Sequence, residues 1–219
     1  MIEVFLADVS SLEDEKLFRY YYEKMPSVRK NKIDAYKFDK DKRLSLGAGI
    51  LVGRAFAELC EKRAEVYGDR VITEDDVIIL DGGKPEIPGI CFSISHSGQM
   101  AILAMSDELV GCDIELKRDA TKGIAESYFA DDEVAYLKGI AGEAARKDAF
   151  FDIWTKKESY IKATGEGLSR SLDSFSVLQM KENFVTIDEY EDYAISIYTC
   201  GDLDVSITQI DFAKDIDLL

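Results

Sequence analysis

The sequence predicts a mixed α and β fold in which the two halves of the chain pack as one body. Strand-like apolar runs recur in both halves, and each half also has a segment with apolar residues at helical spacing. No low-complexity linker separates the halves. The chain of 219 residues can bury a sizeable core, because a chain of this length hides roughly 70% of its unfolded surface.

The first half is predicted to combine a first strand with one long helix. Alternating apolar residues predict a strand over Ile2–Ala7, and Ser10 or Ser11 followed by acids predicts a helix start that continues through Tyr22. Apolar residues at helical spacing predict the long helix over Leu44–Val66. The remaining predictions are strands at Val77–Leu80, Ile90–Ser95 and Met100–Met105, a turn at Asp81–Pro85 and a connection at His96–Gln99.

The second half is predicted to begin after a polar break at Ser106–Glu108. We therefore divide the chain into residues 1–107 and 108–219. A strand is expected over Leu109–Glu115, and two or three helices are expected within residues 121–165. Further strands are expected at Phe175–Leu178, Phe184–Ile187, Tyr193–Tyr198 and Leu203–Thr208. Sequence similarity between the halves is too weak to establish an internal repeat.

Composition excludes several classes of protein. The net charge of -16 argues against a nucleic-acid binder. No run approaches the ~18 apolar residues of a membrane helix, and no basic region precedes an apolar stretch at the N-terminus. Four cysteines without a CxxC spacing are expected to be reduced thiols of a cytoplasmic protein, and a single histidine excludes a His-rich zinc site.

The charge is unevenly distributed along the chain. Residues 1–43 hold ten Lys and Arg against nine Asp and Glu, whereas residues 180–219 hold two Lys against ten Asp and Glu. An anionic ligand is therefore expected to find its cations in the first half.

Two acidic motifs are the strongest chemical signals. Asp113 and Glu115 are two residues apart, which places both carboxylates on one face of a strand, with Cys112 and Ile114 directed to the core. Such a pair suits a divalent cation, although acids at a solvated strand end are common. Glu158 and Lys162 are four residues apart on a helix face. They are either an ordinary stabilising pair or a third oxygen ligand followed by a phosphate-binding lysine.

Other candidate residues are weaker when taken singly. His96 stands at a strand end in Ser95-His96-Ser97-Gly98, either as a structural hydrogen-bond partner or as a phosphate contact. Trp154, one turn before Glu158, is expected to pack in the core. The chain shows no nucleophilic Ser/His/Asp arrangement and no GxGxxG or GxxxxGK[ST] loop.

Taken in order, these motifs resemble an Sfp-type 4'-phosphopantetheinyl transferase over residues 28–178. The ISHSG, DIE and WTKKESYIK blocks are specific as an ordered set, although none is specific alone. The matching segments are Arg43–Gly47, Gly83–Pro85, Phe92–Gly98, Gly111–Glu115, Phe129–Glu133, Trp154–Lys162 and Gly165–Leu168.

The resemblance implies an α+β fold of two similar halves that form an intramolecular pseudo-dimer. The first half would bind coenzyme A, and the second half would hold magnesium and the catalytic residues. The expected activity transfers phosphopantetheine from coenzyme A to a serine of an apo acyl or peptidyl carrier protein, releasing 3',5'-ADP. Such enzymes serve fatty-acid or antibiotic and other secondary-metabolite biosynthesis. The length favours a monomer over the single-half carrier synthases that assemble as trimers.

The resemblance also implies roles for individual residues. Asp113, Glu115 and Glu158 would bind Mg²⁺, Glu158 would also take the proton of the carrier serine, and Lys162 would contact the pyrophosphate. The nucleotide and its phosphates would be held by Arg43, Lys84, Pro85, Ser95 and His96. Lys32 would lie near the 3'-phosphate, with Arg29 or Lys30 as alternatives.

Two departures and two other readings accompany this resemblance. Cys112 stands where the family more often has Ile or Val, a small apolar replacement. The charge of -16 is awkward for an acidic carrier, so we expect an apolar docking face with a few lysines, near Lys156, Lys157 and residues 121–140. The alternatives are a non-catalytic relative that binds coenzyme A or carrier proteins, and a metal-dependent phosphodiester hydrolase. Intact acids argue against the first, and the lack of a second metal cluster argues against the other.

Overall fold

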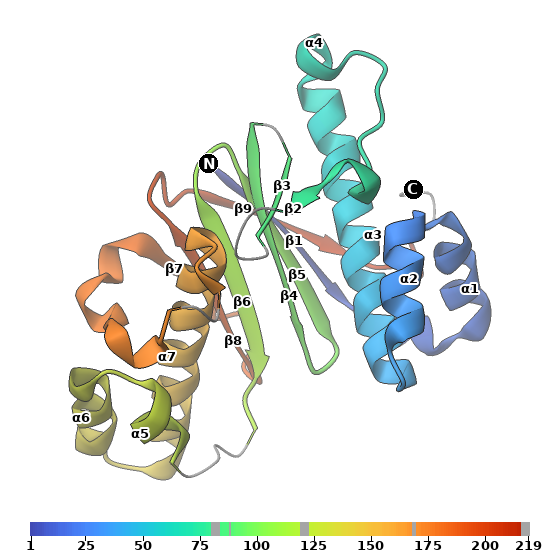
Figure 1. The fold of residues 1–219 in the computed structure, drawn as a ribbon. Helices are drawn as coiled ribbons and strands as arrows, with labels where there is room; N and C mark the ends of the chain where they lie inside the picture. Colours follow the sequence, from blue (N-terminus) through green and yellow to red (C-terminus); the bar gives the residue numbers. More distant parts are fainter. Residues whose placement is uncertain (80–83, 88, 119–122, 168–169, 216–219) are drawn as a thin grey trace.

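The computed structural model describes residues 1–79, 84–87, 89–118, 123–167 and 170–215. It arranges them in four layers, with a six-stranded and a three-stranded sheet in the middle and helices on the two outer sides (Figure 1). The mixed helix-and-strand prediction is therefore confirmed. Within these ranges, no helix is both long enough and apolar enough to cross a membrane.

The helices of the first half begin at different residues from those predicted. Asp14 caps the first long helix, because its carboxylate accepts the N–H groups of Lys16 and Leu17. The predicted caps Ser10 and Ser11 instead lie in a 3-10 turn. The elements are η1 (Ser10–Glu13), α1 (Glu15–Lys24), α2 (Ser27–Ala35), α3 (Asp39–Lys62), α4 (Ala64–Tyr67) and η2 (Glu74–Asp76).

Two features of these helices escaped the sequence pattern. The long helix α3 begins at Asp39 rather than Leu44, because its first turn is charged and carries Asp39 and Asp41 where the helix dipole favours acids. The helix α2 was not predicted, since the segment is rich in basic residues and buries only Arg29 and Ile33, which gives no apolar helical pattern. Both helices contact the candidate site described below.

The larger sheet has the strand order β2-β3-β4-β5-β1-β9. Its strands are β1 (Ile2–Asp8), β2 (Ile78–Ile79), β3 (Pro85–Ile87), β4 (Ile90–Ser97), β5 (Met100–Ser106) and β9 (Val205–Ile210). The central strand β1 pairs antiparallel with β5 and parallel with β9. Because β9 comes from residues 108–219 yet pairs with β1, the sheet contains strands from both parts of the chain; the division at residue 107 stays a prediction.

Most strand predictions for the first half are confirmed, with shifts at the ends. Leu80 and Asp81–Gly83 lie outside the described residues, and Pro85 belongs to β3 rather than to a turn. His96 and Ser97 extend β4, so Gly98 and Gln99 alone connect β4 to β5.

The smaller sheet has the order β6-β8-β7 and carries the helices of the second half on its outer face. These elements are β6 (Val110–Leu116), α5 (Ile124–Tyr128), α6 (Asp131–Gly139), α7 (Glu143–Thr164), η4 (Leu172–Ser174), η5 (Val177–Gln179), η6 (Lys181–Asn183), β7 (Phe184–Thr186) and β8 (Tyr193–Thr199). The three helices confirm the prediction for residues 121–165.

The predicted strand Phe175–Leu178 is wrong. The Phe175 carbonyl accepts a hydrogen bond from Lys157, and the Val177 N–H donates to Glu133. Side chains from α7 and α6 therefore bind the backbone groups that a strand would use for its ladder. The last two residues of the segment instead belong to the 3-10 turn η5.

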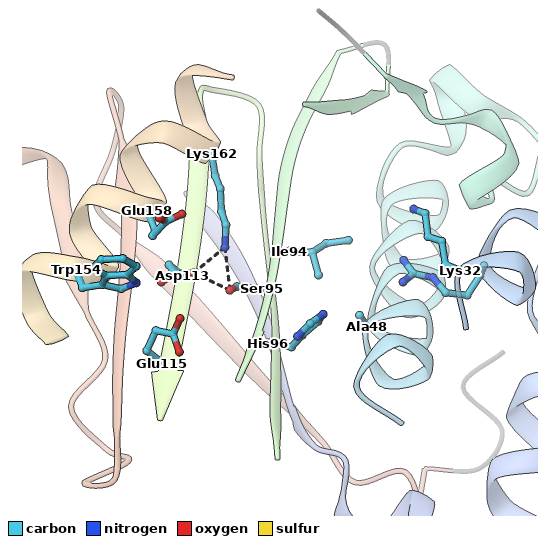
Figure 2. A pocket seen from close by; sticks show the side chains of 11 residues that line it. Lys32, Ala48, Ile94, Ser95, His96, Asp113, Glu115, Trp154, Glu158 and Lys162 are labelled. Carbon is cyan, nitrogen blue, oxygen red and sulfur yellow. Dashed lines mark hydrogen bonds and ion pairs between the residues drawn. The ribbon is translucent and has the colours of Figure 1, made fainter. Parts of the chain in front are cut away.

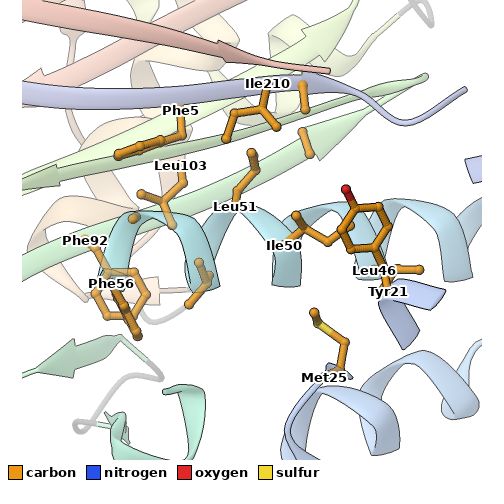
Figure 3. Packing of buried hydrophobic residues seen from close by; sticks show 14 of the residues in the cluster. Phe5, Tyr21, Met25, Leu46, Ile50, Leu51, Phe56, Phe92, Leu103 and Ile210 are labelled. Carbon is orange, nitrogen blue, oxygen red and sulfur yellow. The ribbon is translucent and has the colours of Figure 1, made fainter. Parts of the chain in front are cut away.

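Strand alternation separates three hydrophobic cores. Phe5 and Leu103 face α3, where they meet Leu51 and Phe56 (Figure 3). The next residues on the same strands face the smaller sheet, whose β6 and β8 close this middle core from the other side. The third core lies between the smaller sheet and α5–α7. The two sheets are therefore held face to face, and each carries its long helix on the outer side.

The fully buried ion pair between Lys157 and Glu133 gives a first testable prediction. The Nζ–Oε2 distance is 2.7 Å, neither side chain is exposed, and Lys157 also donates to the carbonyls of Leu172 and Phe175. Lys157→Ala leaves the Glu133 carboxylate buried without its cation, so we expect a loss of about 3–5 kcal/mol in urea unfolding.

The neighbouring Lys156 supplies the matched control. It pairs with Asp152 near the surface, so Lys156→Ala should change the unfolding free energy by no more than about 1 kcal/mol. Equal losses for the two variants would contradict a structural role for the buried pair.

Candidate active site

A cavity of about 520 Å³ lies between α3 and α7, where β4 of one sheet runs beside β6 of the other (Figure 2). Carboxylates approach it from β6 and α7, and basic side chains approach it from α2, α7 and β4. Its lining residues are Arg29, Lys32, Ala48, Ile94, Ser95, His96, Asp113, Glu115, Trp154, Glu158 and Lys162.

The strand β6 directs two acids into the cavity and two apolar residues away from it. Asp113 and Glu115 line the cavity, whereas Cys112 and Ile114 are fully buried in the core between the sheets. Burial raises the pKa of the Cys112 thiol to about 11, so it stays protonated. The alternation predicted from the sequence is thus confirmed.

The helix α7 lies directly against β6 because β6 carries a glycine at the contact. A methyl group on Gly111 would collide with the Ser159 carbonyl oxygen and with the backbone nitrogen of Ala163. The Thr155 hydroxyl also contacts the Ser196 hydroxyl of β8 at 2.8 Å. This close packing holds Glu158, which lies in the same part of α7, near the acids of β6.

Lys162 bonds to the sheet rather than to its helical neighbour Glu158. Its Nζ lies 2.6 Å from Asp113 Oδ1 and 2.9 Å from Ser95 Oγ. Burial alone would lower the pKa of Lys162, but the acidic groups around it, Asp113 foremost, together outweigh burial and raise the pKa, so the lysine is charged. The ordinary pair within one helix face is therefore not its contact here.

Serine side chains join β4 to β6 across the boundary between the sheets. Ser95 Oγ donates to Asp113 Oδ1 at 2.7 Å, and Ser97 Oγ donates to Glu115 Oε2 at 2.7 Å. Ser93 Oγ accepts the Cys112 N–H at 3.1 Å. We call Ser93, Ser95 and Ser97 the serine ladder. It places the β4 side of the cavity against the acids of β6.

Burial and nearby negative charge raise the pKa of Glu158 and Glu115. Burial raises the pKa of Glu158, and the negative charge of Asp113 raises it further. Burial also raises the pKa of Glu115, although the Ser97 hydrogen bond opposes that shift. Carboxyl groups held this way gain stability when a cation joins them, and Glu158 becomes a better proton acceptor near neutral pH.

Basic groups from the first half form the opposite wall. The Arg29 guanidinium is held by Glu74 and by the Ser45 carbonyl, and Lys32 lies one turn further along α2. His96 opens to solvent, yet the surrounding protein desolvates its imidazole and lowers its pKa, as do the charges of Lys162 and Arg29. This wall combines the two cationic side chains of α2 with a neutral imidazole, which suits an anionic ligand.

Two of the three basic residues left open by the sequence line the cavity. Arg29 and Lys32 are three residues apart on α2, so both reach the cavity, whereas Lys30 turns to the Glu23 carbonyl. Recognising α2 as a helix would have selected this pair. Trp154, expected only in the core, both stacks on Phe150 and lines the cavity.

Three predicted nucleotide contacts lie outside the cavity lining. Arg43 pairs with Glu13 at 3.3 Å. Lys84 donates to the Ala163 carbonyl at 2.5 Å, near the end of α7, and Pro85 begins β3 beside it. Of the Gly165–Leu168 motif, Leu168 lies outside the described residues.

The residues fit a hard divalent cation in kind, although they do not form a closed cluster. No three His, Cys, Asp or Glu side chains of the described segments stand close enough together to hold a metal ion. However, Asp113 is 3% exposed, and its Oδ2 is buried without a hydrogen-bond partner in those segments. The carboxylates of Glu115 and Glu158 line the same cavity. Carboxylate oxygens are the ligands that Mg²⁺ prefers.

Comparison with known proteins identifies the family of this chain. The model of the 4'-phosphopantetheinyl transferase superfamily matches residues 109–209. The chain is 30% identical over 193 residues to the 4'-phosphopantetheinyl transferase psf-1 of Bacillus pumilus, covering 85% of this chain and 78% of that relative. It is 28% identical over 227 residues to gsp of Aneurinibacillus migulanus, covering 98% and 91%. The chain belongs to the 4'-phosphopantetheinyl transferase superfamily.

Other relatives match over a shorter stretch. The 4'-phosphopantetheinyl transferase ffp of Bacillus subtilis is 33% identical over 141 residues, which are 62% of this chain and 62% of the relative. A second Bacillus subtilis 4'-phosphopantetheinyl transferase is 35% identical over 149 residues, covering 64% of this chain and 66% of the relative. The chain thus spans just under two thirds of these two relatives.

The contact at Gly111 gives the second prediction. Gly111→Ala should push α7 away from β6 and separate Glu158 from Asp113, because the methyl group meets backbone atoms that cannot move independently. We expect a lower unfolding temperature and a large loss of any activity that the cavity supports. Gly139→Ala is the control, since a methyl group there meets nothing within 4 Å. A Gly111→Ala protein that matches this control would refute the close-packing argument.

Proposed function

We propose that this chain transfers 4'-phosphopantetheine from coenzyme A to a serine of an apo acyl or peptidyl carrier protein. The serine oxygen would form a bond to the phosphorus that carries the pantetheine arm. The bond from that phosphorus to the bridging oxygen would break, and 3',5'-ADP would leave. Family membership and the names of the relatives support this activity.

One observation carries the proposal: a single cavity has carboxylates on one wall and cations on the other. Asp113, Glu115 and Glu158 come from β6 and α7, whereas Arg29 and Lys32 come from α2. A pyrophosphate needs both walls, because cations bind its oxygens while carboxylates hold a bridging metal and accept a proton.

Each residue then has a distinct role. Glu158 takes the proton of the incoming serine, directly or through water, and its raised pKa suits this task. Lys162 leaves part of its contact with Asp113 to neutralise the pyrophosphate. His96, Ser95, Lys32 and Arg29 hold the phosphates and nucleotide. Arg43, Lys84 and Pro85 remain proposed contacts at the nucleotide's outer side.

We propose Mg²⁺ as the metal that Asp113, Glu115 and Glu158 bind. When bound, it would reduce the negative charge that the attacking oxygen must approach. The buried, unpartnered Oδ2 of Asp113 supports this assignment. The protein's own contribution is to hold the three carboxylates and to keep Lys162 charged beside them.

We propose that the carrier docks near α5 and α6. Tyr128 and Tyr136 are 48% and 50% exposed there, and Tyr128 contacts Trp154 edge-on at 6.1 Å, which links this surface to the cavity. The expected contribution of Lys157 is wrong, because its side chain is completely buried. Lys156 remains the accessible lysine of the pair.

The overall organisation is proposed from the same family membership. Each half contains one long helix on one sheet, α3 on the larger and α7 on the smaller, which supports two similar halves related as a pseudo-dimer. We also propose that the protein acts as a monomer in the cytoplasm.

Mass spectrometry of the carrier tests the activity directly. Apo carrier proteins of fatty-acid, polyketide and peptide-synthetase type are incubated with the protein, coenzyme A and MgCl₂. We expect at least one carrier to gain the mass of one phosphopantetheine, and we expect no gain in a parallel reaction that contains EDTA from the start. Tight coenzyme A binding without any gain would show a binding-only relative. Formation of 3',5'-ADP without carrier modification would show a hydrolase.

Replacement of the proposed base gives a sharper prediction. Glu158→Gln should lower transfer by about 10²–10⁴-fold, because the amide cannot take the serine proton. Coenzyme A binding by calorimetry should remain, since the cations of the first half are unchanged. Near-normal transfer by this variant would remove Glu158 from the mechanism.

A further inference from the structure

We propose that Ser97 is a positioning residue that fixes the Glu115 carboxylate toward the cavity. The inference rests on the proposed function in one respect, the assignment of Glu115 as a metal ligand. The contacts that carry it lie in the serine ladder between β4 and β6.

The ladder matches the spacing of the two acids. Ser95 and Ser97 are two residues apart on β4, and Asp113 and Glu115 are two residues apart on β6. Each hydroxyl donates to the carboxylate 18 positions later, at 2.7 Å in both cases. Because both strands present every second residue to the same side, one hydroxyl faces each carboxylate.

The orientation of the Ser97 hydroxyl is set by a backbone amide of β6. Its oxygen accepts the Leu116 N–H at 3.1 Å while its hydrogen points to Glu115 Oε2. A hydroxyl has one donor and two acceptor sites. The amide occupies an acceptor site, which favours the rotamer that donates to the carboxylate. Glu115 is therefore held by a group that is itself anchored on the backbone of β6.

This arrangement leaves one oxygen of each acid available. Asp113 Oδ1 is held by Ser95 and Lys162, and its Oδ2 has no partner. Glu115 Oε2 is held by Ser97, and no hydrogen bond to its Oε1 is found in the part of the chain that the structure describes. The ladder thus orients both carboxylates with a free oxygen each, as a metal ligand requires.

Like Ser97, Ser93 lies on β4 and its hydroxyl oxygen accepts a backbone N–H of β6, but it donates to no carboxylate of the described residues. Its hydroxyl accepts the Cys112 N–H at 3.1 Å, and its carbonyl accepts the Cys112 thiol at 3.2 Å. It therefore contributes to joining the strands without orienting an acid. Ser93→Ala is the matched control for Ser97→Ala, and Ser97→Thr retains the hydroxyl.

The test compares these three variants with the wild-type protein by two readouts. The first is the Mg²⁺ concentration that gives half-maximal carrier modification, together with kcat at saturating Mg²⁺. The second is Mn²⁺ binding to the protein saturated with coenzyme A, followed by the free-Mn²⁺ electron paramagnetic resonance signal and corrected for coenzyme A alone. Thermal unfolding shows whether each variant is folded.

We expect Ser97→Ala to raise the half-maximal Mg²⁺ concentration and to weaken Mn²⁺ binding, each by about 10–100-fold. Loss of a hydrogen-bond partner of a metal ligand typically has an effect of this size. Excess Mg²⁺ should restore most of kcat. Ser97→Thr should recover wild-type metal affinity, and Ser93→Ala should leave it unchanged even where it lowers the unfolding temperature.

Other outcomes would overturn the inference. Equal weakening by Ser93→Ala and Ser97→Ala would show that the ladder only joins the strands, and unchanged Mn²⁺ affinity in Ser97→Ala would show no positioning. Wild-type protein that binds no Mn²⁺ would remove Glu115 as a ligand. If the wild type binds Mn²⁺ but modifies no carrier, the proposed function fails while the Mn²⁺ comparison still decides the role of Ser97.

Discussion

The contact between β4 and β6 is the interaction on which the site depends. These strands belong to different sheets, and serine side chains connect them. A backbone ladder would fix the strands without engaging the acids. Here the same hydroxyls that join the sheets also bond one oxygen each of Asp113 and Glu115, which lowers the cost of holding two carboxylates close together. The joint between the sheets and the orientation of the acids are therefore one structural feature.

The long helices complete the site from opposite sides of that joint. Gly111 lets α7 approach β6 until Lys162 reaches Asp113, and Gly49 on α3 leaves room for the Arg29 side chain to cross. In both places a glycine leaves room for the contact: Gly111 allows Lys162 to reach Asp113, and Gly49 allows Arg29 to reach the cavity. In a chain with a net charge of -16, a local gathering of Arg29, Lys32 and Lys162 gives an anionic ligand a place to bind.

The sequence predicted those parts of the fold that follow from local alternation and spacing. Strand alternation placed Asp113 and Glu115 together, and the order of motifs indicated the family. The sequence failed where a distant partner decides the outcome. Phe175–Leu178 looks like a strand, but Lys157 and Glu133 bind its backbone. Arg29 is held by Glu74, 45 residues away. Lys157 looks accessible beside Lys156, yet it is buried against Glu133 of α6 and the carbonyls of Leu172 and Phe175. No local pattern reports such contacts.

The central claim is that β6 and α7 hold one metal between their carboxylates, opposite the cations of the first half. Crystals of the protein with coenzyme A and Mn²⁺ test it through the anomalous signal of manganese. The account predicts one anomalous peak within coordination distance of Asp113, Glu115 and Glu158, with the pyrophosphate beside it. A peak at other side chains, or bound coenzyme A with no peak at these three acids, would contradict the account.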